Sequence, residues 1–137
     1  DNIVALKDAT GDLSRPYSLR LAGSKRLELL SGEDMTAVAF NLAGGTGCIS
    51  VSANVAPKQC AAIQQACLDG KWDEAAKLQE SLAQLHNAMF VETSPAPVKA
   101  ALSMMGKCEN ELRLPLTTAS ERNKISVHTA LKNLHLI

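Results

Sequence analysis

The sequence lacks three features that mark common classes of protein. It has no excess of basic charge, because 14 lysine and arginine residues balance 14 aspartate and glutamate residues; a nucleic-acid-binding surface is therefore excluded. It has no apolar run near the roughly 20 residues that span a bilayer. No signal pattern of charged, apolar and small residues opens it. We therefore expect a cytoplasmic protein that binds neither nucleic acid nor membrane.

Metal-binding and disulfide patterns are also missing. The four cysteines lack the Cys-x-x-Cys spacing, and Cys60 and Cys67 fall at helical spacing in an amphipathic segment. Small buried thiols are therefore favoured over disulfides or metal ligands, and this applies to Cys48, Cys60, Cys67 and Cys108. The histidines are predicted to lie in helices without a clustered partner, which argues against a metal or triad role for His86, His128 and His135.

A short apolar run near the start ends on a lysine. Ile3 to Leu6 is rich in β-branched residues and reads as a strand buried on both faces, with Lys7 at its carboxyl end. A lysine there would lose hydration, which favours the free amine that can attack a carbonyl. The alternative is that Lys7 extends from the strand end into solvent.

The first half of the sequence alternates strands and helices. Strands are predicted at residues 3–6, 27–30 and 47–51, each followed by a helix. Such units form parallel sheets with right-handed crossovers. A closed (β/α)8 TIM barrel takes about 250 residues. We therefore predict the last three βα units, strands six to eight, as a partial TIM barrel over residues 1–69.

The second half contains only helical patterns. Residues 70–137 are predicted to form a carboxyl-terminal helical appendage, whose last helix runs from Ser120 to about Leu134. The first residue, Asp1, is not a methionine and stands just before a core strand. Because such a strand needs neighbours on both edges, we expect the chain to be the carboxyl-terminal portion of a longer enzyme.

Several polar residues and glycines have local explanations. Asp12 is predicted to cap the helix that carries Leu13, Tyr17 and Leu21, and Asp8 to bind its own loop, in preference to a catalytic carboxylate pair. Glu33 and Asp34 are predicted to favour the next helix through its dipole. The glycine cluster at 44–47 precedes a strand, so it indicates a helix stop and a turn instead of a phosphate loop.

Several stretches carry a family resemblance. They are Ile3-Val4-Ala5-Leu6-Lys7-Asp8-Ala9-Thr10-Gly11-Asp12, Leu30-Ser31-Gly32-Glu33-Asp34, the stretch from Gly44 to Val55, Phe90-Val91-Glu92, Pro95-Ala96-Pro97-Val98-Lys99 and Leu112-Arg113-Leu114-Pro115-Leu116. In this order they resemble the class I aldolases of the dihydrodipicolinate synthase and N-acetylneuraminate lyase superfamily. The resemblance is strongest to dihydrodipicolinate synthase, also named 4-hydroxy-tetrahydrodipicolinate synthase, and it covers nearly the whole chain.

The resemblance implies a lyase of lysine and diaminopimelate biosynthesis that needs no cofactor and no metal. Lys7 would form a Schiff base with pyruvate, and the resulting enamine would add to L-aspartate-4-semialdehyde. Gly32 and Ile49 would line the pyruvate pocket. Leu13 and Ser14 match a region of subunit contacts in tetrameric relatives, so the parent enzyme is expected to be a homo-oligomer, a tetramer or a dimer.

Alternative functions remain open for each of these residues. Gly32 fits a simple strand-to-helix turn, and Ile49 fits the filling of a barrel interior. Another acceptor aldehyde would make the protein an N-acetylneuraminate lyase or a keto-deoxy-sugar aldolase. A different class altogether is a non-catalytic half-barrel that serves as an assembly piece. The family's paired threonines, proton-relay tyrosines and carboxylate-binding arginine belong to strands one to five and match no residue of this chain, so the chain alone is expected to be inactive.

Overall fold

The structure is a computed structural model that describes residues 2–23 and 26–137. Strands and helices alternate first, and helices alone follow. The elements are β1 (Ala5–Asp8), α1 (Arg15–Leu21), β2 (Glu28–Ser31), α2 (Ala37–Leu42), β3 (Gly47–Cys48), the 3-10 helix η1 (Ser52–Asn54), α3 (Pro57–Leu68), α4 (Trp72–Ala88), α5 (Ala96–Met104) and α6 (Glu121–Asn133). This order confirms the predicted change from βα units to helices.

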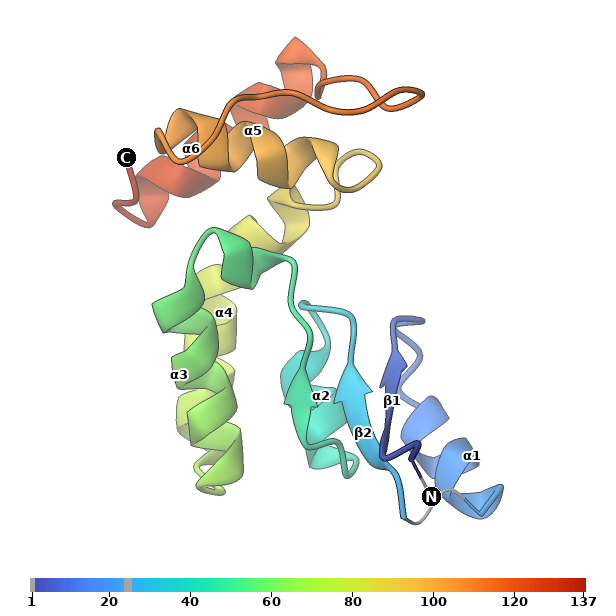
Figure 1. The fold of residues 1–137 in the computed structure, drawn as a ribbon. Coiled ribbons are helices and arrows are strands. Elements are labelled where there is room, and N and C mark those ends of the chain that lie inside the picture. The colour runs from blue at the N-terminus through green and yellow to red at the C-terminus, as the bar shows by residue number, and fades with distance from the viewer. Residues whose placement is uncertain (1, 24–25) are drawn as a thin grey trace.

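The three strands form one parallel sheet in the order β1-β2-β3. Helix α1 returns the chain from β1 to β2, and α2 returns it from β2 to β3 (Figure 1). A parallel sheet whose neighbours are joined by helices is the repeating arrangement of a (β/α)8 barrel. All three strands therefore direct their carboxyl ends to the same edge of the sheet.

Strand β1 is less covered than its sequence predicts. Ile3 and Val4 are 73% and 67% exposed, so the prediction of a strand buried on both faces is wrong for this chain. Within the described residues β1 pairs with β2 alone. A parallel strand becomes buried only when strands flank both of its edges and other elements cover its faces, and the outer edge of β1 has no such neighbour here.

The main hydrophobic core lies among α3, α4, α5 and α6. Helices α3 and α4 run side by side, and α5 and α6 pack together at the other end of the molecule (Figure 1). Full burial of a leucine or valine stabilises the fold by about 1.5–3 kcal/mol. The largest fully buried side chains of this core are Val55, Leu82, Leu85, Met89, Val127 and Leu131. Helix α3 belongs to the first predicted domain, residues 1–69, yet it shares this core with the helices of residues 70–137. The predicted domain boundary between residues 69 and 70 therefore stays a prediction.

Helix ends in this region follow local signals. Pro57 is the first residue of α3, where its missing N–H costs no hydrogen bond. Gly70 follows α3 with φ +70°, a conformation that glycine adopts without strain. Ser120 is the N-cap of α6. The predicted start of the last helix is therefore confirmed. His135 lies beyond the end of α6, so its predicted place in a helix is wrong.

One local prediction in the first half, the capping role of Asp12, is wrong in detail. The N-cap of α1 is Ser14, and Asp12 instead accepts a hydrogen bond from the Ser14 N–H at 2.8 Å. The apolar stripe at Tyr17 and Leu21 is 61% and 89% exposed, so it does not face a core in this chain. Gly44, which follows the C-cap residue Ala43 of α2, has φ +103°, and this confirms the predicted helix stop.

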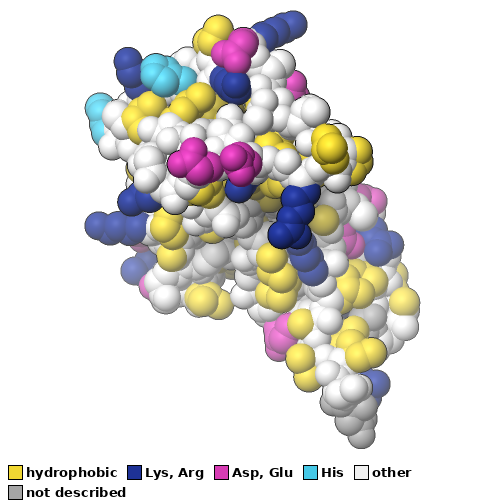
Figure 2. Space-filling view, turned by 45° about the horizontal axis from the view of Figure 1, so that its top comes forward, with side chains coloured by type: hydrophobic (Ala, Val, Ile, Leu, Met, Phe, Trp, Pro, Cys, Tyr) yellow, Lys and Arg dark blue, Asp and Glu magenta, His cyan; other side chains and the backbone are white. Residues whose placement is uncertain are grey.

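Charged side chains of both signs are mixed with apolar ones on the face shown in Figure 2. On this face basic side chains are scattered and do not merge into one continuous patch. Among the described residues, no helix combines the length and the apolar character that crossing a bilayer requires.

Candidate functional site

Lys7 lies at the carboxyl end of β1, one residue before the strand ends. Its side chain passes over Gly32: a Cβ atom added to that glycine would lie 2.6 Å from Lys7 Cε. The same added atom would lie 2.7 Å from Ala9 Cβ. Only a residue without a side chain therefore fits beneath the lysine.

Strand register places the predicted site residues on one face of the sheet. Lys7 pairs with Leu30, and Leu30 pairs with Gly47. Side chains alternate between the faces along a strand, so Gly32 and Ile49, each two residues further on, return to the face that carries Lys7. The three predicted site residues therefore gather at the carboxyl end of one face of the sheet.

Ile49 lies just past the end of β3, which is shorter than the predicted strand at 47–51. Its N–H continues the ladder by donating to the Ser31 carbonyl at 2.8 Å. The side chain is 48% exposed, so it fills no core in this chain.

The predicted dehydration of Lys7 is wrong for the described structure, because Lys7 is exposed. Barrel interiors are dry when eight strands close around them and layers of side chains fill them. Among the described residues the sheet has three strands, and its face that carries Lys7 and Ile49 is open to solvent. The position of Lys7 is therefore as predicted, but its surroundings are not.

Asp8 fixes the turn that follows Lys7. Its side chain is 2% exposed and accepts hydrogen bonds from Arg15 Nε at 2.8 Å, from Thr10 N at 2.9 Å and from Thr10 Oγ1 at 2.6 Å. Burial raises the pKa of Asp8, but the hydrogen bonds from Thr10 and Arg15 outweigh it and hold the pKa below its ordinary value. The structure thus agrees with the predicted loop partner.

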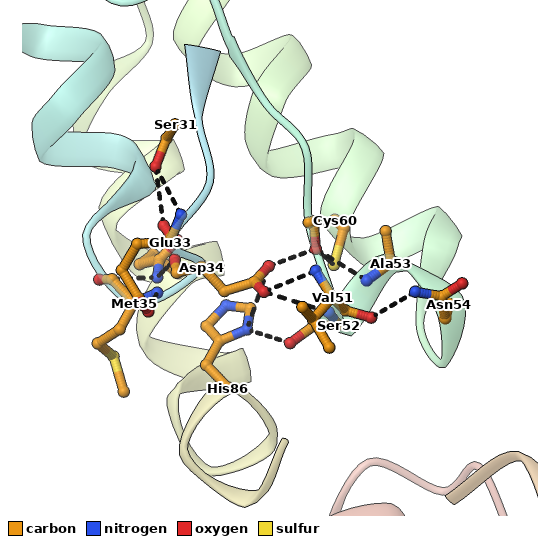
Figure 3. Close-up of polar contacts among 12 residues, drawn as sticks. Ser31, Glu33, Asp34, Met35, Val51, Ser52, Ala53, Asn54, Cys60 and His86 are labelled. Carbon is orange, nitrogen blue, oxygen red and sulfur yellow. Dashed lines mark hydrogen bonds and ion pairs between the residues drawn. The ribbon is translucent and has the colours of Figure 1, made fainter. Parts of the chain in front are cut away.

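Asp34 connects two loops at the same edge of the sheet. Its buried carboxylate accepts hydrogen bonds from Ser50 Oγ, from Val51 N at 2.9 Å and from Ser52 N at 3.2 Å (Figure 3). Helix α2 begins only at Ala37 and has no acidic residue in its first turn. The prediction that Glu33 and Asp34 act on the dipole of this helix is therefore wrong: long-range hydrogen bonds decide the role of Asp34.

His86 joins this cluster from α4. Its Nδ1 lies 2.8 Å from Ser52 Oγ and 3.9 Å from Asp34 Oδ1. Burial lowers the pKa of His86, with the nearby charges of Asp34 and Glu33 acting in the opposite direction. The prediction that this histidine lacks a clustered partner is wrong. No local sequence pattern predicts this contact, because His86 and Ser52 lie 34 residues apart in the sequence.

The opposite face of the sheet carries Cys48, which pairs with Ser31. Burial, aided by the charge of Asp34, raises the pKa of the Cys48 thiol to about 12. Burial likewise raises the pKa of Cys60. All four cysteines are free thiols, and Cys60 and Cys67 are buried in α3 as predicted. Cys48 and Cys108 are only partly buried, so the prediction of buried thiols is wrong for these two. A neutral buried thiol is a poor nucleophile. Among the described residues, no three His, Cys, Asp or Glu side chains are grouped to hold a metal ion.

Comparison with known proteins agrees with this geometry. The family model of the dihydrodipicolinate synthetase family matches residues 1–134. A 4-hydroxy-tetrahydrodipicolinate synthase of Parvibaculum lavamentivorans is 48% identical over 136 residues, which cover 99% of this chain and 47% of that protein. The enzyme of the same name from Rhizobium meliloti is 46% identical, with the same two coverages. The chain therefore spans about half the length of the curated relatives it matches.

Solved structures have the same fold. The dihydrodipicolinate synthase of Aquifex aeolicus superposes with a TM-score of 0.94 at 36% identity, covering 98% of this chain and 46% of that one. The chloride-inhibited synthase of Acinetobacter baumannii, solved in complex with pyruvate, gives a TM-score of 0.93 at 40% identity, covering 99% of this chain and 47% of that one. These matches identify the three βα units and the helices after them as part of a TIM-barrel enzyme fold. The chain belongs to the dihydrodipicolinate synthetase family.

Proposed function

We propose that this chain is the carboxyl-terminal part of a longer enzyme, called here the parent enzyme. The parent enzyme condenses pyruvate with L-aspartate-4-semialdehyde to 4-hydroxy-tetrahydrodipicolinate in lysine and diaminopimelate biosynthesis. One observation carries the proposal: Lys7 lies over Gly32 at the edge of the sheet where TIM-barrel active sites are built. The names of the relatives and the pyruvate complex of the Acinetobacter baumannii neighbour support the choice of substrates.

Lys7 supplies the nucleophile of this reaction. Its amine attacks the ketone carbon of pyruvate, and loss of water gives an iminium. The iminium draws electrons from the methyl carbon, which loses a proton to give an enamine. The enamine carbon then adds to the aldehyde of the semialdehyde, and cyclisation releases the product and frees the lysine. The electron sink is the iminium itself, so this sequence of steps uses no metal and no cofactor.

Gly32 and Ile49 line the pyruvate site in this proposal. The absence of a side chain at Gly32 lets the lysine and a ligand approach the backbone closely. The side chain of Ile49, 48% exposed, is free to contact a small ligand on the same face. In the parent enzyme, strands one to five would cover this face, exclude water and favour the free amine of Lys7.

The 137-residue chain alone should be inactive. Proton-relay and carboxylate-binding groups of such a site would come from strands one to five, and each commonly contributes ~10²-fold or more to the rate. Turnover of pyruvate and the semialdehyde by the isolated chain at a rate near that of a full-length relative would refute this part of the proposal.

A homo-oligomeric parent enzyme, a tetramer or a dimer, is part of the proposal. It is supported by the exposed apolar side chains of Leu13, Tyr17 and Leu21 at α1, which are 39%, 61% and 89% exposed. Exposed apolar side chains of this kind are available for contact with another protein surface. A cytoplasmic location remains a prediction from the sequence.

Replacement of the lysine tests the function directly. Lys7→Arg keeps the charge but removes the nucleophile, so turnover by the parent enzyme should fall by at least about 10²-fold. Lys77→Arg in α4 is the matched control and should keep full turnover. Supplying sugar aldehydes in place of the semialdehyde separates a neuraminate-type or keto-deoxy-sugar aldolase from the proposed synthase. Full activity of Lys7→Arg would leave the non-catalytic assembly role standing.

A further inference from the structure

One side chain ties together the two loops that carry Gly32 and Ile49. Asp34 lies two residues after Gly32, and its carboxylate binds the three residues that directly follow Ile49 (Figure 3). Two of these bonds go to backbone N–H groups, so they hold the path of the loop itself. The separation between the loop after β2 and the loop after β3 therefore depends on this carboxylate.

Helix α4 supports the junction of these two loops, formed by Asp34 and residues 50–52, from outside the sheet. Gln79 Nε2 donates to the carbonyl of Asp34 at 2.8 Å and to that of Met35 at 3.2 Å. His86, about two turns further along α4, contacts Ser52 Oγ. The side chains of Asp34 and His86 are each 2% exposed. The hydrogen bonds of these two side chains therefore meet little competition from water.

Resting on the proposed function, we propose that Asp34 is a positioning residue for the pyruvate site. It acts through the loops and not on the substrate, because its carboxylate is engaged by residues 50–52. It keeps Gly32 and Ile49 at the spacing from the Lys7 amine that binds a keto acid. No local sequence pattern at Gly32 or Ile49 indicates that their positions depend on Asp34.

The charge of Asp34 matters because every partner of its carboxylate is a donor. An ionised carboxylate accepts at both oxygens, and hydrogen bonds to it are roughly twice as strong as neutral ones. In Asp34→Asn, one of the two acceptor atoms becomes an NH2 group that faces either Ser50 Oγ or the backbone N–H groups of Val51 and Ser52. A serine hydroxyl can also accept a hydrogen bond, so an NH2 group that faces Ser50 Oγ reverses that contact and leaves neutral hydrogen bonds in place of charge-assisted ones, whereas an NH2 group that faces Val51 N and Ser52 N breaks both backbone bonds. In either arrangement the loop after β3 is held less tightly and can shift. A shift of about 1 Å at a catalytic site can cost ~10²-fold in rate.

The experiment compares variants in the parent enzyme. Asp34→Asn is expected to raise the KM for pyruvate by about tenfold and to slow borohydride trapping of pyruvate on Lys7 in proportion. Ser50→Ala removes one donor and is expected to raise the KM by a smaller factor. In the double variant the two effects should be less than multiplicative, because both changes disrupt the same contact.

Two controls separate positioning from general stability. Val127→Ala weakens the core at α6, far from the sheet, and should lower the unfolding temperature while leaving the KM for pyruvate unchanged. Asp69→Asn makes the same chemical change at a carboxylate that binds only Gln65 and Lys71 in the described contacts, and should leave the KM unchanged. If Asp34→Asn behaves like Val127→Ala, with lower stability and an unaltered KM, the positioning role is overturned while the proposed function stands. If the unaltered parent enzyme forms no adduct on Lys7, both are overturned.

Discussion

Gly32→Ala is the most specific perturbation of the lysine site, because it adds one carbon atom beneath Lys7. The new Cβ would lie 2.6 Å from Lys7 Cε, 2.7 Å from Ala9 Cβ and 3.1 Å from Ala9 Cα. Carbon atoms in contact normally lie about 3.5–4.0 Å apart. The lysine chain must therefore move by about 1 Å, since the Ala9 backbone leaves the added carbon little room to move away.

The expected loss is larger in catalysis than in stability. Overpacking of this kind costs about 1–3 kcal/mol in the free energy of unfolding. A displacement of about 1 Å at the nucleophile costs ~10²-fold in rate. In the parent enzyme, kcat/KM for pyruvate should therefore fall by about two orders of magnitude, and borohydride should trap correspondingly less pyruvate on Lys7.

Gly70→Ala is the matched control. Gly70 has φ +70° and no atom within 4 Å of an added Cβ, so alanine introduces backbone strain of about 1–2 kcal/mol without any contact at the site. This variant should lose stability and keep kcat/KM. If Gly32→Ala retained kcat/KM within a factor of about two, the claim that the Lys7 side chain needs a residue without a side chain at position 32 would be refuted.

Three further predictions concern stability of the chain. Leu85→Ala, in the fully buried core, should lower the free energy of unfolding in urea by about 2–5 kcal/mol. Leu21→Ala, at an 89% exposed side chain, should change it by less than about 0.5 kcal/mol, and equal losses would contradict the core assignment. Because burial lowers the pKa of His86, the unfolded chain binds protons more readily; stability is full above pH 6.5 and falls as the pH drops below it. His86→Gln should flatten this slope in urea titrations between pH 7.5 and 5.5, and an unchanged slope would rule out His86 as its source. The lowered pKa of Asp8 makes its contribution full above pH 3.8 and lost as the pH falls through the lower folded value. Asp8→Asn should therefore reduce stability by about 1–2 kcal/mol at pH 7, and the difference should shrink as the pH is lowered below 3.8; equal thermal unfolding of the two forms at pH 7 would contradict the Arg15 and Thr10 contacts.

Local signals were sufficient for much of the fold. Pro57 and Gly70 bracket α3, and Ser120 precedes α6, because proline, glycine and serine act through their own backbone and side-chain chemistry. Exposure could not be predicted in the same way. Ile3 and Tyr17 have the residue types of a core, yet both face solvent, because burial depends on which other segments lie nearby.

The candidate site was likewise predictable only in part from the sequence. The grouping of Lys7, Gly32 and Ile49 follows from the strand ends and from the alternation of side chains along a strand. The roles of Asp34 and His86 were missed, because their partners lie 16 or more residues away in the sequence. Only the packed arrangement of α4 against the strand-end loops brings them together.

The covalent state of Lys7 tests the central claim most directly. The parent enzyme, incubated with pyruvate and borohydride and then digested, should carry one reduced pyruvate adduct on the peptide that contains Lys7. An intact, folded parent enzyme that gives no adduct, or an adduct only on another lysine, would contradict the claim that this amine captures the keto acid.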